Sequence, residues 1–433
     1  MRIAQGHFEM VLRNSYLQGC WEIVRHRIDV SKLFGEGCYL IYFDNAATTW
    51  PKPPEVWQAM EHCIKSVGAN PGRSGHQMAV RAARLVDEAR EQLSLLFNIS
   101  NPDRIVFTLN ATEALNLAIK GLLKPGDHVI TSSMEHNAVT RPLYLLQEKG
   151  VEVTKVACAR DGSIRVTDIN SAVKQNTVAI IITHASNVTG TLMPLAEIGQ
   201  LAKRKKLRLI VDAAQTAGVF NLDVPFMNIH LLAFTGHKGL YGPTGTGGLY
   251  LADGLELETL KEGGTGSMSQ IPDQPDLLPE RYESGTLNTV GISGLAAGLK
   301  FVRNEGTEKI RQYEMNLTSR FLAGAKKVKG LKVYGPEELY ERAPVVAFSL
   351  AGKNSGRVGI LLDQEYNIAC RAGLHCAPDA HRTLGTLENK LVRFSFSYFN
   401  KEEEIDSAVR ALMEIAALPN ERFAEVKNSP CGC

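Results

Sequence analysis

Two short segments of the chain bring together a carboxylate, an amide and an amine among small residues. Asp212-Ala-Ala-Gln215 closes one apolar run, and Lys238 follows the next one in Thr235-Gly-His-Lys-Gly. A poorly solvated lysine in such a turn is a good nucleophile for the aldehyde of a cofactor. A carboxylate at a strand end can keep a pyridine nitrogen protonated, which makes the ring an electron sink. Either residue alone would suit a cap or a surface charge, but together they indicate an aldehyde-cofactor site.

A third segment, Cys370-Arg-Ala-Gly-Leu-His-Cys-Ala-Pro378, adds a candidate nucleophile, Cys376. The thiolate is the form that attacks sulfur, and nearby positive charge lowers the pKa of a thiol. Arg371 and the adjacent His375 could supply that charge. A buried, unreactive cysteine is the alternative interpretation of Cys376, whereas Cys370 is more typical of a core position.

Two further patterns suit anionic groups. Asn110-Ala-Thr-Glu113 reads as a capped helix start, where backbone N–H groups and the helix dipole can bind a phosphate. Arg393 stands between apolar and aromatic residues, and a buried arginine needs an anion. Its guanidinium could hold a substrate carboxylate through two parallel hydrogen bonds. A structural ion pair is the alternative for Arg393.

The elements that must position these residues are short apolar runs alternating with helix-length amphipathic stretches. This alternation predicts βαβ units and a buried parallel sheet. The expected strands are residues 104–108, 128–131, 177–183, 207–212 and 229–234. Because ligands bind at the carboxyl ends of parallel strands, the polar residues that follow these runs predict one site at one edge of the sheet.

The pattern changes from about residue 297, which predicts a second domain. We expect a helical stretch over 299–328, short strands near 345–350 and a last helix over 401–417. The expected division is an N-terminal extension (1–40) without assigned purpose, a large domain (41–296), a small α+β domain (297–425) that returns Arg371, Cys376 and Arg393 to the cleft, and a flexible tail (426–433) containing Cys431 and Cys433.

Composition excludes several classes of protein. The 433 residues include 48 basic and 46 acidic side chains, so no net field is available to hold nucleic acid or a membrane surface. No apolar stretch has the length of a bilayer span, and the first 40 residues lack a secretory signal. Eight irregularly spaced cysteines predict reduced thiols in a cytoplasmic protein, with no metal site.

From about Tyr42-Phe-Asp-Asn-Ala-Ala-Thr-Thr49 to Arg393 the chain resembles the class V aminotransferase branch of fold-type I pyridoxal-phosphate (PLP) enzymes, specifically the cysteine desulfurase and selenocysteine lyase group. The resemblance implies an α/β large domain with a mostly parallel seven-stranded sheet flanked by helices, and a smaller α+β C-terminal domain. It also implies pyridoxal 5′-phosphate as the cofactor and a homodimer with shared active sites.

The resemblance assigns roles to the matching residues. Lys238 is implied to form the Schiff base, with Asp212 at the pyridine nitrogen and Gln215 at the phenolic oxygen, while His136 stacks on the ring. The residues implied at the cofactor phosphate are Ala111, Thr112, Thr235 and His237, with Thr286 from the neighbouring subunit. The residues implied to contact substrate or cofactor are Asn45, Asn187, Arg371 and Arg393.

The segment around Cys376 resembles the Arg-x-Gly-x-His-Cys-Ala loop of one desulfurase subgroup, although Leu374 replaces a common second histidine. The implied reaction removes sulfur from L-cysteine and leaves L-alanine and a persulfide on Cys376. L-Selenocysteine is a possible substrate as well, which would lose selenium. An acceptor protein or thiol would then take the sulfur, for example in iron–sulfur cluster assembly. A class V aminotransferase with another substrate, or a cofactor-binding protein without turnover, are the alternatives. A Rossmann dehydrogenase is disfavoured because the glycine fingerprint is missing after the first strand.

Overall fold

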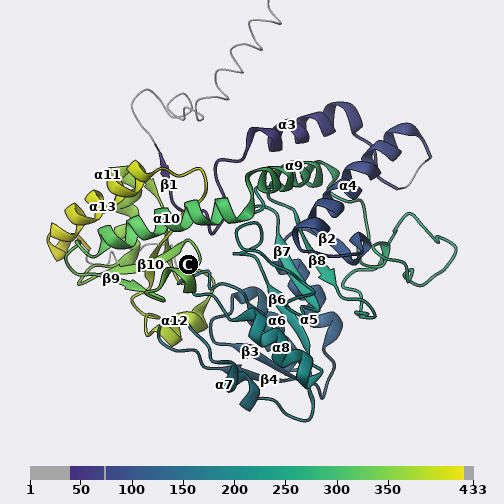
Figure 1. The fold of residues 1–433 in the computed structure, drawn as a ribbon, viewed down its shortest axis with the longest axis horizontal. Helices are drawn as coiled ribbons and strands as arrows, with labels where there is room; N and C mark the ends of the chain where they lie inside the picture. Colours follow the sequence, from purple (N-terminus) through teal and green to yellow (C-terminus); the bar gives the residue numbers. More distant parts are fainter. Residues whose placement is uncertain (1–39, 73–74, 424–433) are drawn as a thin grey trace, which may run out of the picture.

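Seven strands form the sheet at the centre of the larger lobe, in the order β2-β8-β7-β6-β5-β3-β4 (Figure 1). They are β2 (Ile105–Thr108), β3 (His128–Ser132), β4 (Glu152–Val156), β5 (Thr177–Thr183), β6 (Arg208–Asp212), β7 (Leu231–Thr235) and β8 (Gly247–Leu251). Neighbouring strands run parallel except β8, which is antiparallel to both β2 and β7. The predicted seven-stranded, mostly parallel sheet is confirmed. This computed structural model describes residues 40–72 and 75–423.

Both faces of this sheet are covered, which explains the continuous apolar runs in the sequence. Along β5, Ile180 and Ile182 enter one hydrophobic core, while Ala179 and Ile181 enter the other. This is the period of two expected for a strand between two layers. Residues of α5 and α6 pack on one face, and residues of α4, α8 and α9 on the other.

The helices of the larger lobe connect the strands and cover the sheet. They are α3 (Pro54–His62), the π-helical η1 (Cys63–Val67), α4 (Gln77–Leu96), α5 (Ala111–Leu122), α6 (Asn137–Gln147), α7 (Val166–Ser171), α8 (Leu195–Lys205) and α9 (Thr289–Glu305). The N-cap of α5 is Asn110, whose side chain accepts a hydrogen bond from the backbone N–H of Glu113 at 3.0 Å. The capped helix start predicted from the sequence is therefore present.

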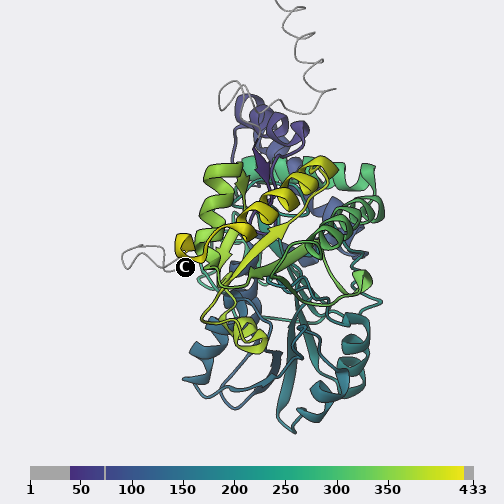
Figure 2. The same cartoon turned by 90° about the vertical axis from the view of Figure 1, so that its left-hand side faces the viewer.

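The smaller lobe is built on a four-stranded antiparallel sheet, in the order β12-β13-β10-β9. Its elements are α10 (Thr307–Ala325), β9 (Leu331–Tyr334), β10 (Val345–Leu350), α11 (Ser355–Tyr366), β11 (Ile368–Ala369), β12 (Arg371–Gly373), α12 (Pro378–Leu384), β13 (Leu391–Ser395) and α13 (Glu402–Ala417). Phe321, Phe348 and Phe394 pack together in its core, against residues of α13. After a quarter turn this lobe faces the viewer and lies in front of part of the larger one (Figure 2).

The observed lobes differ from the expected domain limits at two places. Strand β1 (Ile41–Tyr42) pairs with β11, so the first described strand belongs to the smaller lobe although it was expected in the large domain. The expected limit at 296/297 falls inside α9, which packs on α3 and α4; Gly306, between α9 and α10, is a better division. The expected extension, apart from residue 40, and the expected tail with Cys431 and Cys433 lie outside the described residues.

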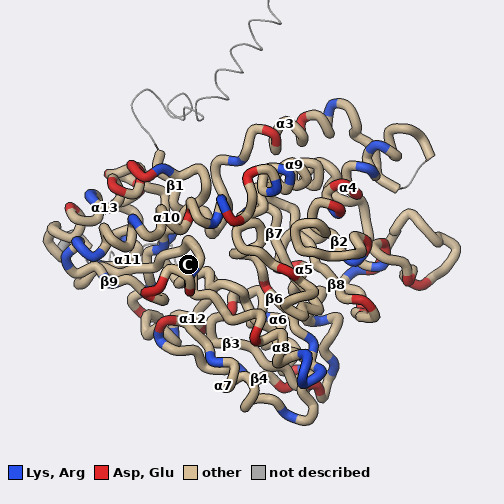
Figure 3. Tube along the Cα trace, viewed as in Figure 1, with Lys and Arg blue, Asp and Glu red and all other residues tan. Residues whose placement is uncertain are grey.

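Charges of both signs are interspersed along the trace (Figure 3). Among residues 40–72 and 75–423, no helix is long and apolar enough to cross a membrane, and no cluster of potential metal ligands is found. Cys63, Cys158, Cys370 and Cys376 are free thiols.

Candidate active site

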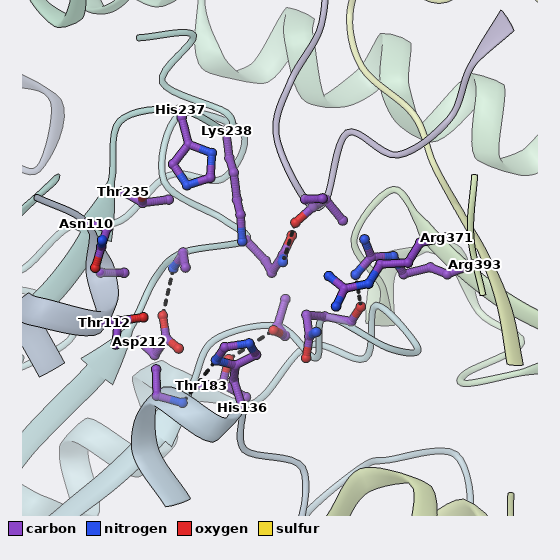
Figure 4. Close-up of a pocket in the computed structure, with 18 residues that line it drawn as sticks. Asn110, Thr112, His136, Thr183, Asp212, Thr235, His237, Lys238, Arg371 and Arg393 are labelled. Carbon is purple, nitrogen blue, oxygen red and sulfur yellow. Dashed lines mark hydrogen bonds between the residues drawn. The ribbon is translucent and has the colours of Figure 1, made fainter. Parts of the chain in front are cut away.

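One pocket of about 300 Å³ lies at the carboxyl ends of the parallel strands, where the smaller lobe meets the sheet (Figure 4). Its polar lining side chains come from both lobes: Asn110, Thr112, His136, Thr183, Asn187, Asp212, Gln215, Thr235, His237, Lys238, Arg371 and Arg393. Segments far apart along the chain thus converge on the edge of the sheet that the sequence indicated.

Lys238 and Asp212 are the central pair of the pocket. Lys238 follows β7 and its side chain extends into the pocket (Figure 4), while Asp212 ends β6. Burial lowers the pKa of the Lys238 amine to about 8, against the opposing effect of Asp212. Burial raises the pKa of Asp212, which Lys238 and a 2.9 Å hydrogen bond from the backbone N–H of Ala214 partly offset. The amine can therefore lose its proton near neutral pH, as a nucleophile requires.

The turn that carries Lys238 rests on the glycine-rich segment that follows it. Gly236 donates a backbone hydrogen bond to the Thr246 carbonyl, and Gly242 donates one to the Gly236 carbonyl, each at 2.8 Å. A Cβ atom at Gly236 would lie 2.1 Å from Oγ1 of Thr246. Only glycine fits at this position, and the hydrogen bonds to the glycine-rich segment hold the lysine turn in place.

One end of the pocket is suited to an anion. Ala111 and Thr112 form the first turn of α5, where backbone N–H groups have no intrahelical partner. His237 faces the pocket (Figure 4), and its Nδ1 is buried without a hydrogen-bond partner among the described residues. Burial, followed by Lys238 and Lys52, lowers the pKa of His237 to about 4. The α5 terminus and the imidazole thus offer donors to a phosphate-sized group.

His136 enters the pocket from the start of α6. Its Nδ1 accepts a hydrogen bond from the backbone N–H of Ala138 at 3.0 Å, so the ring caps the helix. Burial and the nearby Lys238 lower the pKa of His136 to about 4. The ring is therefore neutral at physiological pH, with its proton on Nε2. Gln215 lines the pocket and donates from Nε2 to the Ala46 carbonyl at 3.1 Å.

Arg393 is the most deeply buried cation of the site, with 1% of its surface exposed. Its Nη1 donates to the Asn187 carbonyl at 2.9 Å, and its Nη2 pairs with Oδ1 of Asp44 at 2.6 Å. Its Nε and the side-chain oxygen of Asn187 are both buried without a partner among the described residues. Arg393 thus forms an ion pair with Asp44, as in the structural alternative given above. It also lines the pocket, where its Nε could still donate a hydrogen bond to a ligand.

Cys376 lies in the turn between β12 and α12 and is partly exposed. Its Sγ is 3.3 Å from Nη2 of Arg371, which itself lines the pocket. The prediction that His375 also supplies positive charge is wrong. His375 is 1% exposed, and burial and Arg393 hold its pKa well below the usual range. Cys370 packs against the core of the smaller lobe, where burial raises its pKa to about 12.

Three predicted site residues are not part of the pocket lining: Cys376, described above, Asn45 and Thr286. Asn45 is buried beside it, and its amide donates to the carbonyls of Tyr42 and Ser395 and to Oδ1 of Asn400. These bonds shape the loop after β1, and contact of Asn45 with substrate or cofactor stays a prediction. Thr286 is exposed on a loop and accepts a hydrogen bond from Asn70 at 3.3 Å. Its predicted place in a neighbouring subunit's site stays a prediction.

Sequence reasoning missed several groups around the pocket. Asp44 was quoted within a motif, but nothing in the sequence connects it with Arg393. Glu135 precedes His136 and is fully buried, with its Oε1 accepting a hydrogen bond from the Thr183 backbone N–H at 3.1 Å. Lys52 donates to the His237 carbonyl at 2.6 Å, and burial lowers its pKa to about 7. Glu135 could have been found from the sequence, because it is a polar residue directly before the predicted site residue His136.

These residues fit the cofactor that the resemblance implies. A helix N-terminus and an unpartnered imidazole nitrogen meet at one end, suited to a phosphate, and the amine of Lys238 suits an aldehyde. The buried carboxyl of Asp212 suits a ring nitrogen. The phosphate, the aldehyde and the ring nitrogen of pyridoxal phosphate thus each have a suitable group in the pocket.

Comparisons with known proteins show the family of the chain. The sequence profile of the aminotransferase class-V family matches residues 41–408. A probable cysteine desulfurase of Methanothermobacter thermautotrophicus is 35% identical, over 87% of this chain and 95% of that protein. A cysteine desulfurase of Escherichia coli is 33% identical, over 88% of this chain and 95% of that protein.

Solved structures give the same result. An apo cysteine desulfurase from Thermococcus onnurineus superimposes with a TM-score of 0.83 and 31% identity, covering 91% of this chain and 98% of that one. A cysteine desulfurase from Escherichia coli gives a TM-score of 0.77 and 29% identity, covering 87% and 95%. The fold is that of fold-type I enzymes. The chain belongs to the class-V aminotransferase family, in its cysteine desulfurase group.

Proposed function

We propose that this protein is a cysteine desulfurase that removes sulfur from L-cysteine, releases L-alanine and keeps the sulfur as a persulfide on Cys376. The observation that carries the proposal is a thiol beside the cofactor pocket. Cys376 Sγ lies 3.3 Å from the guanidinium of Arg371, which lines the same pocket as Lys238. An adjacent cation favours the thiolate, the form that attacks sulfur. An aminotransferase has no need of this thiol.

Pyridoxal phosphate, when bound, supplies an aldehyde for the substrate amine and a ring that stores electrons. The chain itself supplies binding and proton transfer. Arg393 binds the substrate carboxylate with its remaining N–H groups, and Lys238, whose pKa lies at about 8, takes the α-proton as a free amine. Asp212 would hold the proton of the ring nitrogen, and the neutral ring of His136 would stack on the cofactor.

The sulfur step balances without an outside oxidant or reductant. The Cys376 thiolate attacks the substrate sulfur, an S–S bond forms and the substrate Cβ–S bond breaks. The electron pair of that bond stays with carbon, which takes up a proton to give the alanine methyl group. Cβ is reduced, and the two sulfur atoms are oxidised to the persulfide level. A second thiol, free or on an acceptor protein, then removes the outer sulfur.

Product analysis tests the proposal. Purified protein loaded with pyridoxal phosphate is incubated with L-cysteine and a thiol reductant, and alanine, sulfide and keto acid are measured. We expect equal amounts of alanine and sulfide, with sulfide release lost in Cys376→Ser. Keto acid as the main product would instead indicate an aminotransferase, and unchanged turnover in the variant would remove Cys376 from the reaction. L-Selenocysteine in the same assay determines the preferred substrate.

We also propose a homodimer in which Thr286 of the partner subunit completes the phosphate site. The exposed position of Thr286, outside the pocket of its own chain, supports this. Hybrid dimers test it: Lys238→Ala and Thr286→Ala chains are each expected to be weakly active alone, and a refolded mixture should regain activity. No gain on mixing would contradict the shared site. The physiological acceptor, such as an iron–sulfur scaffold, and a cytoplasmic location belong to the same proposal, supported by the free thiols.

A further inference from the structure

The turn that presents Cys376 has an unusual backbone. His375 and Cys376 both have positive φ, 53° and 57°, although neither is glycine. Side chains rarely adopt this left-handed region, so two consecutive residues in it must be held by surrounding contacts. A backbone hydrogen bond from the Ala377 N–H to the Leu374 carbonyl at 3.0 Å closes the turn. Asn187 Nδ2 donates to the His375 carbonyl at 2.6 Å, and the Asn137 N–H donates to the Cys376 carbonyl at 2.8 Å.

A chain of side-chain contacts continues from this turn into α12. His375 Nε2 is 3.3 Å from the Arg371 carbonyl, and His375 Nδ1 is 3.5 Å from Nε2 of His381. His381 Nδ1 is in turn 2.9 Å from Oγ1 of Thr386. The two rings are nearly parallel, with an interplanar angle of 10°. The residues form one continuous line from the Arg371 backbone to Thr386.

The carbonyl at one end assigns every proton in this line. A carbonyl only accepts, so His375 must carry its proton on Nε2 and accept at Nδ1. His381 then donates from Nε2, accepts at Nδ1, and receives the Thr386 hydroxyl proton there. This assignment holds when both histidines are neutral, each with its proton on Nε2.

Burial and charge enforce the same state. His375 and His381 are 1% and 0% exposed, and burial lowers the pKa of both rings. The charged groups that face His375 are the guanidiniums of Arg393 and Arg371, which oppose a further positive charge. His381 faces the neutral His375 and Thr386.

We propose that His381 and Thr386 are positioning residues for the sulfur-accepting thiol: through His375 they fix the left-handed turn and the Arg371 backbone, and so set the guanidinium against Cys376 Sγ. The inference rests on the proposed function, in which Cys376 is the nucleophile. Neither His381 nor Thr386 lines the pocket, so we expect their effect mainly on the reactivity of Cys376 and little effect on substrate binding.

Substitutions that differ only in the donated hydrogen bond test this proposal in the cofactor-loaded protein. His381→Leu removes the donor and keeps a buried side chain, whereas His381→Gln keeps an N–H group near the position of Nε2. Thr386→Val removes the terminal hydroxyl at constant size. The matched control on the same helix is Thr383→Val, because Thr383 donates to Ser133 and to the Asp379 carbonyl, outside the line.

Two readouts are measured: kcat and KM for L-cysteine, and the pH dependence of Cys376 alkylation by iodoacetamide without substrate. We expect His381→Leu to lower kcat about tenfold, the effect of one lost hydrogen bond, with KM near the wild-type value. Its alkylation profile should move to higher pH. His381→Gln should have a kcat and an alkylation profile close to those of the wild type. Thr386→Val should change both in the same direction as His381→Leu, but by less. Thr383→Val should change neither.

A folded His381→Leu protein with wild-type kcat and an unmoved alkylation profile would overturn the proposal. If His381→Leu does not fold, an unmoved profile in Thr386→Val has the same consequence. A wild-type protein that makes no alanine would instead contradict the proposed function, while the alkylation profiles would still decide the role of the histidine line.

Discussion

At the scale of single residues, the two arginines of the pocket have different partners and so different expected roles. Arg393 is tied to Asp44 and to the Asn187 carbonyl, and it lies deep in the site. Arg371 comes from the neighbouring strand, directly opposite Arg393 in the sheet, yet its guanidinium contacts Cys376. One arginine is placed to bind the substrate carboxylate, and the other to stabilise the thiolate.

Exchange of each arginine for lysine should separate these roles. Lysine keeps the charge but loses the planar fork, so Arg393→Lys should raise KM for L-cysteine by about tenfold or more. Arg371→Lys should leave KM nearly unchanged but lower kcat and slow Cys376 alkylation, because the hydrogen bond from Nη2 to Cys376 Sγ is lost. Steady-state kinetics and the alkylation profile check both, and the reverse pattern would contradict the assignment.

At the scale of elements, the site depends on two turns in close contact. Gly218, after the Asp212 turn, has a φ of 88°, and a Cβ there would lie 2.2 Å from the carbonyl oxygen of Gly239. Gly239 directly follows Lys238. The segments that carry the carboxylate and the amine therefore approach each other through glycines, and their separation is fixed by backbone contact.

Gly218→Ala should destabilise the protein by about 2 to 3 kcal/mol, because both the positive φ and the close contact become unfavourable. Gly254→Ala is the matched control, since Gly254 also has a positive φ, 70°, but a Cβ there would meet nothing within 4 Å. The control should cost only about 1 kcal/mol. Unfolding free energy and bound cofactor per chain are measured. Equal effects of the two substitutions would show that the contact between the turns is unimportant.

The sequence predicted the strands that carry the site but not every element. Strand β4 is missing from the prediction because its residues are mostly polar and partly exposed at the sheet edge. Strand β8 contains Gly247 and Gly248, which local propensity places in a loop. Both glycines are required by close contacts with neighbouring backbone that only the folded sheet reveals.

The site was predicted in its large-lobe residues and less well in the smaller lobe. Polar residues at strand ends, such as Asp212, can be predicted as site residues because they directly follow an apolar run. The Asp44–Arg393 pair joins residues 349 apart, which no local pattern encodes. The neutral state of His375 depends on its burial beside Arg393 and on its contact with His381. Local sequence gives residue types, whereas these partners follow from the packing of the lobes.

At the scale of the whole molecule, buried carboxyl groups make stability depend on pH. Glu314 on α10 is 2% exposed, and the Tyr241 hydroxyl donates to its Oε1 at 3.3 Å. Burial raises the pKa of Glu314 to about 8, and the pKa of Glu135 similarly to about 8. These carboxyls stay protonated in the folded protein while their unfolded counterparts ionise. Their contribution to stability is full below about pH 4.5 and is lost as pH rises toward 8.

Glu314→Gln should make the protein less sensitive to pH, because an amide does not titrate. Each such carboxyl lowers the unfolding free energy by up to about 1.4 kcal/mol per pH unit between its two pKa values. The variant should therefore gain stability relative to wild type as pH rises through this window. Thermal midpoints of the cofactor-free proteins across the window check this, and parallel curves would contradict a protonated Glu314.

The transfer of sulfur to Cys376 is tested most directly by a single turnover. One equivalent of L-cysteine is added to the cofactor-loaded protein without reductant. Alanine is quantified, and the mass of the peptide that contains Cys376 is measured by mass spectrometry. We predict one alanine per active site and one added sulfur atom on Cys376, with neither the added sulfur nor stoichiometric alanine in Cys376→Ser. Alanine formed with the added sulfur on another cysteine, or with none on the protein, would contradict the account.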